Sequence, residues 1–308
     1  MLNEKYKALA EQLTENFPTS TVLTEEPMKA HTTFRIGGPA DIYIEPEHND
    51  IVGILHLLTM EDVPFIIIGN GSNLLVSDQG IEGAVIALGK KSGKITINGD
   101  TIVAEAGALL STVANQAAEA GLTGLEFASG IPGTLGGAVY MNAGAYGGEI
   151  KDVLESVTVI DEAFENHQYK PQELDMSYRR SALMEKGGYV TDVVLKLTPG
   201  DKIEIKSKID EIREQRVAKQ PLNYPSAGST FKRPEGFFAG KLIDDAGLRG
   251  YTVGGAQVSE KHCGFVINTG NATAAEVLQL MNDVDTKVYQ KFGVHLSPEV
   301  RIIGRNIN

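Results

Sequence analysis

The chain has 308 residues, 42% hydrophobic and 22% charged, which is typical of a globular protein with a core large enough for two or three packed units. A formal net charge of −12 argues against a general nucleic-acid binder, because such binding depends on cationic surface. The only cysteine is Cys263, which excludes disulfides within the chain and cysteine-based zinc sites and indicates a reducing compartment.

Residues 1–88 predict an N-terminal helix followed by a compact α+β unit. Residues 1–17 are amphipathic with charges throughout, lack the apolar core of a signal peptide, and are followed by no run of 18 apolar residues. We therefore expect a cytoplasmic protein that does not enter a membrane. Residues 31–46 alternate as short strands, and residues 48–62 have helical spacing. Residues 63–76 return to strand, and their apolar run over residues 63–67 is expected to be buried.

Short strands dominate the next part of the chain, from residue 84 to about residue 197. Asn98-Gly99 predicts a tight hairpin, and Gly121 is placed to end a helix over residues 108–122. A charged helix over residues 205–219 then leads to a boundary near Pro221. Beyond it, Thr273 and Glu276 form a capping-box pattern at the start of a long helix.

Two glycine-rich segments interrupt this pattern, IGNGSNLLVSDQG at residues 68–80 and GLEFASGIPGTLGGAVYMNAGAYGGEI at residues 124–150. Each taken alone is most simply a surface turn, but together they offer backbone N–H groups with few side chains in the way, as a diphosphate requires. The first segment lacks the third glycine of a Rossmann fingerprint, and no P-loop sequence is present. G-x-S-x-G and H-E-x-x-H are also absent, which argues against a serine hydrolase or a zinc enzyme, and no metal site is predicted.

These two segments, followed by DMSYRRS, PSAGSTFKRP and SPEVRIIG, resemble the UDP-N-acetylenolpyruvoylglucosamine reductase family (MurB) from about Lys29 to the C-terminus. The resemblance implies an α+β fold, with a two-subdomain FAD-binding unit of the vanillyl-alcohol-oxidase (PCMH) type and a C-terminal α+β substrate domain. The expected divisions are an N-terminal helix (1–28), two FAD-binding subdomains (29–88 and 89–200) and the substrate-binding domain (201–308).

The family's activity is the NADPH-dependent reduction of UDP-N-acetylglucosamine enolpyruvate to UDP-N-acetylmuramate in peptidoglycan precursor synthesis, with FAD as cofactor and NADPH as co-substrate. No histidine lies between His56 and His167, so we expect the FAD to be held without a covalent bond. By resemblance, the residues that bind FAD are Gly69, Asn70, Gly71, Ser72, Asn73, Gly130, Ile131, Pro132, Gly133, Gly136 and Gly137.

The resemblance also implies the catalytic residues. Arg179 would hold the substrate carboxylate with a two-pronged, permanently charged guanidinium, and Ser229 would donate the proton. Glu299 would stabilise the intermediate with Arg179 or help orient the pair. Without the family context, these would be an exposed arginine, a turn serine and a solvated glutamate. The expected substrate contacts are Tyr178, Lys232, Arg233 and Arg301, the last because it would share a face with Glu299 if residues 299–303 form a strand.

Only 49 residues lie between Arg179 and Ser229, which corresponds to the shorter form of the family, without the loop that carries a substrate-clamping tyrosine. His262 and Cys263 could be a reactive pair, but packing at the edge of an apolar run is the simpler interpretation. Two alternatives stay open at this point: another FAD-dependent oxidoreductase on the same scaffold, and a non-catalytic nucleotide-binding module. The sequence does not indicate an oligomeric state.

Overall fold

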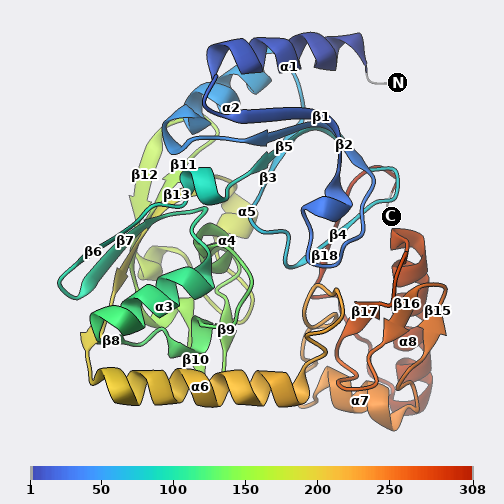
Figure 1. Ribbon diagram of the computed structural model, residues 1–308. Helices are drawn as coiled ribbons and strands as arrows, with labels where there is room; N and C mark the ends of the chain where they lie inside the picture. The colour runs from blue at the N-terminus through green and yellow to red at the C-terminus, as the bar shows by residue number, and fades with distance from the viewer. Residues whose placement is uncertain (1–2, 307–308) are drawn as a thin grey trace. The chain divides into compact units, whose positions relative to one another are not determined.

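The computed structural model describes residues 3–306 of the chain (Figure 1). They form two compact units, each assembled from separate stretches of sequence. The first unit holds the chain up to Thr24, Ile42–Asn70 and Gly83–Gln215, and the second holds Glu25–Asp41, Gly71–Glu82 and the chain from Arg216 onward. The further division of residues 29–200 into two FAD-binding subdomains stays a prediction.

The first unit begins with helix α1 (Glu4–Asn16), whose N-cap Asn3 accepts a hydrogen bond from the Lys5 amide at 3.0 Å. A four-stranded sheet in the order β1-β2-β5-β3 follows. Its strands are β1 (Thr21–Pro27), β2 (Pro39–Glu45), β5 (Ile81–Ala87) and β3 (Phe65–Ile68), and helix α2 spans Ile51–Met60.

Two expectations for this region need correction. Residues 31–46 were expected to be short strands throughout, but residues 31–38 form a bend, a turn and irregular chain after a 3₁₀ segment. Only β2, from Pro39 to Glu45, is a strand in this stretch. The apolar run at Phe65 is only half-buried, because β3 is an edge strand, paired on one side with β5 in parallel register.

A five-stranded antiparallel sheet, in the order β12-β11-β13-β7-β6, forms the rest of the first unit's framework. The predicted hairpin is confirmed: Asn98 pairs with Thr101, and Gly99 has φ +63°. Gly121 ends helix α3 in the left-handed conformation, as predicted. The bounds of these elements are β6 (Ile95–Asn98), β7 (Thr101–Glu105), α3 (Leu110–Ala120), α4 (Leu135–Tyr140), β11 (Leu154–Ile160), β12 (Asn166–Tyr169), α5 (Leu183–Lys186) and β13 (Tyr189–Lys196).

Helix α6 (Lys202–Lys219) starts three residues before the predicted position. The Asp201 carboxylate accepts hydrogen bonds from the Ile203 and Glu204 amides at 2.8 and 3.1 Å, so it caps the first turn. The shorter strands of this part of the chain are β8 (Leu122–Thr123), β9 (Gly144–Ala145), β10 (Gly148–Glu149) and β14 (Thr198–Pro199).

The second unit is built around helix α8 (Ala274–Phe292). The predicted capping box is confirmed, since Thr273 and Glu276 exchange side-chain and backbone hydrogen bonds. One face of the helix joins a core cluster. The other elements are α7 (Ala239–Asp245), the three-stranded sheet β15 (Thr252–Val253), β16 (Ala256–Val258) and β17 (Val266–Asn268), and the parallel pair β4 (Leu74–Val76) and β18 (Arg301–Ile303).

Within residues 3–306, every helix is too short or too polar to cross a lipid bilayer.

Candidate functional site

The two glycine-rich segments touch each other within the first unit. The Asn70 side-chain amide donates a hydrogen bond to the Pro132 carbonyl at 2.6 Å. A Cβ atom at Gly69 would overlap the Thr134 hydroxyl, and one at Gly136 would lie 2.8 Å from the Ala106 Cβ. The bare backbone at both positions is therefore required for the close approach of the surrounding chain.

The other half of the first segment belongs to the second unit, where it supports the C-terminal strand. Gly71 has φ +58°, and a Cβ atom there would overlap the His31 carbonyl, so chain packing explains this glycine. Asn73 donates its side-chain amide to the Glu299 carbonyl at 3.1 Å and accepts the Arg301 amide at 2.9 Å. Asn73 thus fixes the backbone on both sides of residue 300.

Arg179 lies in a tight turn of the first unit. Ser177 and Arg180 exchange backbone hydrogen bonds of 3.0 and 3.2 Å across the turn, and Arg179 has φ +54°, which is uncommon for a residue with a side chain. Its guanidinium donates to the Gly144 carbonyl at 2.9 Å and lies 5.0 Å from the centre of the Tyr178 ring, which is 53% exposed. The turn therefore presents a cation and an aromatic ring together.

Two buried side chains hold this turn to the second glycine-rich segment: Asn142 belongs to that segment, and Ser181 directly follows the turn. The Asn142 amide donates to the Ser177 carbonyl at 3.0 Å and to the Glu149 carboxylate at 2.6 Å. The Ser181 hydroxyl donates to the Tyr140 carbonyl at 2.7 Å. Both Asn142 and Ser181 are 0% exposed, so the side-chain ends of these bonds are buried.

Arg180 is engaged differently from its neighbour. Its guanidinium pairs with Glu185 at 2.9 Å and Asp175 at 2.6 Å, and these hydrogen bonds, Glu185 first, raise the pKa of Arg180 above its usual value. Both carboxylates lie on the exposed surface. The Arg180 guanidinium is thus held by two carboxylates close to it in the sequence.

In the second unit, Thr230 connects the backbone next to Ser229 with the backbone of Glu299. Ser229 pairs with Phe265 on one side, and Phe231 pairs with Pro298 on the other. Thr230 donates its amide to the Gly264 carbonyl at 2.8 Å and accepts the Glu299 amide at 2.8 Å. The backbone next to the serine is therefore bonded directly to the backbone of the glutamate.

The expected strand over residues 299–303 starts only at Arg301. The amides of Glu299 and Val300 donate to the Thr230 carbonyl at 2.8 and 3.4 Å, so these residues pair with a different segment from Arg301, whose amide bonds to Asn73. The strand that would place Glu299 and Arg301 on one face is therefore absent at residue 299.

The other two cations expected at the substrate site, Lys232 and Arg233, are exposed in the second unit. Lys232 is fixed through its backbone, whose amide donates to the Ser297 carbonyl at 2.9 Å. The Arg233 guanidinium lies 4.3 Å from the centre of the Phe238 ring, at the start of α7. This contact limits the directions in which Arg233 can point.

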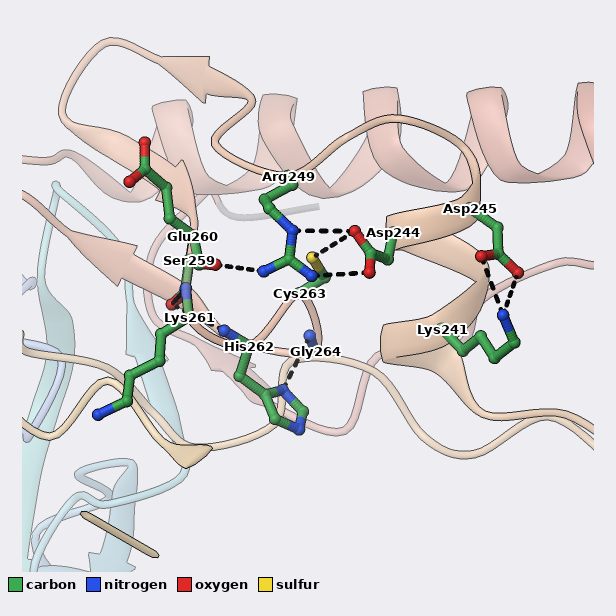
Figure 2. Close-up of polar contacts among 10 residues, drawn as sticks. All are labelled: Lys241, Asp244, Asp245, Arg249, Ser259, Glu260, Lys261, His262, Cys263 and Gly264. Atoms are coloured by element: carbon green, nitrogen blue, oxygen red, sulfur yellow. Dashed lines mark hydrogen bonds and ion pairs between the residues drawn. The ribbon is translucent and has the colours of Figure 1, made fainter. Parts of the chain in front are cut away.

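Figure 2 shows the surroundings of His262 and Cys263. The Cys263 thiol is 5% exposed and donates to the Asp244 carboxylate at 3.6 Å; burial first, and then the nearby carboxylate, raise the pKa of Cys263 to about 11. Burial lowers the pKa of His262, whose Nδ1 accepts the Gly264 amide at 3.1 Å, which places the proton of the neutral ring on Nε2. A protonated thiol and a neutral imidazole engaged with backbone support the simpler interpretation of this pair as packing.

Sequence reasoning missed the buried polar residues beside the candidate catalytic groups, Asn142, Ser181 and Thr230. Asn142 has φ +42°, and an asparagine within a glycine-rich run is a signal for such a conformation. Thr230 gives no comparable signal, because its partners at residues 264–266 and 299–300 lie far away in the sequence.

Family models match two parts of the chain: the FAD binding domain at residues 40–163, and the UDP-N-acetylenolpyruvoylglucosamine reductase C-terminal domain at residues 220–303. Proteins with that reductase name include one from Agathobacter rectalis, 56% identical over 97% of this chain and 99% of the relative. One from Caldanaerobacter subterraneus subsp. tengcongensis is 52% identical, covering 96% of this chain and 98% of the relative. The crystal structure of the Thermus caldophilus reductase covers 92% of this chain and 98% of its own, with 37% identity and a TM-score of 0.79. The chain therefore belongs to the UDP-N-acetylenolpyruvoylglucosamine reductase family.

Proposed function

We propose that Arg179, Ser229 and Glu299 are the catalytic residues of this FAD-dependent oxidoreductase, which uses NADPH to reduce UDP-N-acetylglucosamine enolpyruvate to UDP-N-acetylmuramate. Membership of the family and the matched FAD-binding domain support the activity and the cofactor. The assignment of individual residues rests on the motifs that carry them and on the geometry described above.

The reaction adds a hydride to the β carbon of the enolpyruvyl ether and a proton to its α carbon. FAD, which the two glycine-rich segments would hold, would supply the hydride-transfer chemistry that links NADPH to the substrate. Negative charge then develops between the α carbon and the carboxylate, so a fixed cation beside that carboxylate lowers the barrier. Arg179 fits this role because its guanidinium stays charged and can bind a carboxylate with two parallel hydrogen bonds.

The proton for the α carbon comes from Ser229 in this proposal. The support is the pairing of the serine segment with the glutamate segment through Thr230, which joins the two groups in one rigid piece of backbone. Glu299 would help to stabilise the charged intermediate by orienting the groups that contact it. This pairing is the single observation that carries the assignment of Ser229 and Glu299.

The residues present fit the diphosphate of FAD. The two glycine-rich segments contain no lysine or arginine at residues 69–73 and 130–137, so their backbone amides and small polar side chains would supply the hydrogen bonds. A Cβ atom at Gly137 would meet nothing closer than the Thr134 hydroxyl at 3.5 Å, so that backbone is accessible. We propose that Gly69, Asn70, Gly71, Ser72, Asn73, Gly130, Ile131, Pro132, Gly133, Gly136 and Gly137 hold FAD, without a covalent bond.

The proposed substrate contacts are the exposed residues Tyr178, Lys232, Arg233 and Arg301. Three of them are cations, which the two charged phosphates of a UDP-sugar require in an acidic protein. The shorter family form has no clamping tyrosine loop, so we propose that these cations bind the diphosphate here.

Anaerobic stopped-flow spectroscopy tests the assignment by separating the two half-reactions. In S229A, NADPH should remove the flavin absorbance at the wild-type rate, whereas its return on adding the enolpyruvyl sugar should slow by roughly 10²–10⁴-fold, the range for losing a general acid. The matched control is S226A, three residues away, which should behave as wild type. Equal slowing of both half-reactions in S229A, or a wild-type rate of return, would contradict the role of Ser229.

A further inference from the structure

Thr230 is buried, at 3% exposure, and every polar group of this residue except its hydroxyl proton has a partner in the second unit. Its amide donates to the Gly264 carbonyl at 2.8 Å, and its carbonyl accepts the Glu299 amide at 2.8 Å. Its hydroxyl oxygen accepts the amide of Val266 at 2.9 Å, and Val266 is also buried. A single residue thus connects three chain segments that are distant in sequence.

The segment on one side of Thr230 is itself held firmly, as Figure 2 shows. The Ser259 hydroxyl accepts the amides of Lys261 and His262 at 3.2 and 3.3 Å, and the His262 ring accepts the Gly264 amide at 3.1 Å. These bonds close a compact turn over residues 259–264, which we call the anchor turn. Its last carbonyl, that of Gly264, is the acceptor for the Thr230 amide.

An ion pair fixes the anchor turn to helix α7. Arg249 binds the Asp244 carboxylate through two nitrogens, at 3.0 and 2.7 Å, and a third nitrogen donates to the Glu260 carbonyl. In Figure 2 the guanidinium lies between the acid and the turn, and the Cys263 thiol points at the same carboxylate. The anchor turn is therefore tied to the helix by charge-assisted hydrogen bonds, which are stronger than neutral ones.

We propose that Thr230 is a positioning residue for proton transfer, and that its hydroxyl group sets the placement of Ser229 relative to Glu299. Ser229 is half-buried, and the position from which its hydroxyl group projects is set by the backbone that carries it. Hydrogen bonds to Gly264 and Val266 hold that backbone on one side, and a hydrogen bond to Glu299 holds it on the other. Loss of the hydroxyl leaves the buried Val266 amide without an acceptor, and the segment must shift to regain one.

The inference rests on the proposed role of Ser229 and deepens it. A displacement of about 1 Å in a reacting group costs roughly 10²-fold in rate, so a shift in this segment should appear in the proton-transfer step. Binding of FAD and hydride transfer from NADPH do not use Ser229, and they should be unaffected.

The test compares T230A with T230S, which both lack the threonine methyl group and differ only in the hydroxyl oxygen. In anaerobic stopped-flow, T230A should slow the return of flavin absorbance with the enolpyruvyl sugar by roughly 10- to 100-fold. T230S should stay within about 3-fold of wild type, because it keeps the acceptor for Val266. NADPH-driven loss of absorbance should match wild type in both.

The double variant S229A/T230A distinguishes a positioning role of Thr230 from a purely structural one. If Thr230 acts through Ser229, adding T230A to S229A should produce no further slowing, whereas independent effects would multiply. The matched control is T191V, a buried threonine of the first unit whose hydroxyl donates to the Thr158 carbonyl. T191V should lower the free energy of unfolding, and any change in rate should be the same for flavin reduction and flavin reoxidation.

Several outcomes would overturn the positioning role: equal rates for T230A and T230S, equal slowing of both half-reactions, or multiplicative effects in the double variant. Loss of folding or of flavin in both T230A and T230V, with T230S intact, would show a requirement for folding and would also overturn it. Failure of the proposed function is seen separately, because S229A alone would then show no slowing.

Discussion

Replacement of Asn142 by alanine tests whether the turn that carries Arg179 is held by its buried amide. Asn142 is 0% exposed and makes three side-chain hydrogen bonds, to Ser177, Glu149 and Lys151. The bonds to the Ser177 carbonyl and from the Lys151 amide contribute about 1 kcal/mol each. The bond to the partly exposed Glu149 carboxylate contributes about 1 kcal/mol after its solvent screening is taken into account.

The backbone conformation of Asn142 makes a fourth contribution to the free energy of unfolding. Asn142 has φ +42°, a left-handed conformation that costs alanine about 1 kcal/mol more than asparagine or glycine. The sum is about 4 kcal/mol lost in N142A, and about 3 kcal/mol in N142G, which keeps the backbone conformation but loses the same bonds.

The assay is equilibrium urea unfolding at fixed FAD concentration, together with steady-state kinetics. N142A should also raise the KM for the enolpyruvyl sugar, because the released Ser177 carbonyl loosens the turn that presents Arg179. A loss of stability below about 1 kcal/mol, or an N142G no more stable than N142A, would refute the reasoning, since both values follow directly from the bonds and the backbone angle.

The remaining predictions concern three further groups. G69A should lose FAD on gel filtration, because the added methyl overlaps the Thr134 hydroxyl, and G69A/T134A should recover part of the binding; retention of FAD by G69A would contradict this. R179K should slow the return of flavin absorbance by roughly 10²-fold, because an ammonium cannot grip a carboxylate at two points, whereas R180A should not. Cys263, with a pKa of about 11 against an ordinary value of 9.0, should react with a thiol reagent at pH 8 about 100-fold more slowly in the folded than in the unfolded protein. Because its folded pKa is the higher one, the stability linked to this thiol is present below pH 9 and is lost as pH rises towards 11; a fast reaction at pH 8 would contradict the burial.

The features predicted correctly from sequence are those that adjacent residues determine. The turn at Gly99, the helix end at Gly121 and the capping box at Thr273 each depend on backbone angles or hydrogen bonds within about four residues. The choice of Arg179 over Arg180 comes from the family motifs and stays a prediction.

The features that sequence reasoning missed depend on partners that are distant in the chain. Residues 299–300 leave the expected strand because Thr230, in another segment, takes their amides. The half-buried state of β3 follows from its place at the edge of a sheet, which the strand's own residues do not encode. The packing of Gly71 against the His31 carbonyl, some 40 residues away in the chain, was also missed, and it gives this glycine a structural requirement in addition to its proposed role in FAD binding.

At both parts of the candidate site, the residues proposed to contact a ligand differ from the buried residues that hold them in place. A group that meets a ligand must stay accessible, so it cannot be fixed by burying its own side chain. Precision then has to come from neighbours that have no chemistry to perform: Asn142 and Ser181, at 0% exposure, beside the Arg179 turn, and Thr230, at 3%, beside Ser229. Most of their hydrogen bonds go to backbone groups, which every residue type provides, so the sequence of the partner segment gives little sign of them. A search of sequence for reactive groups therefore finds the residues that carry charge or protons and overlooks those that determine where the charge and protons are delivered.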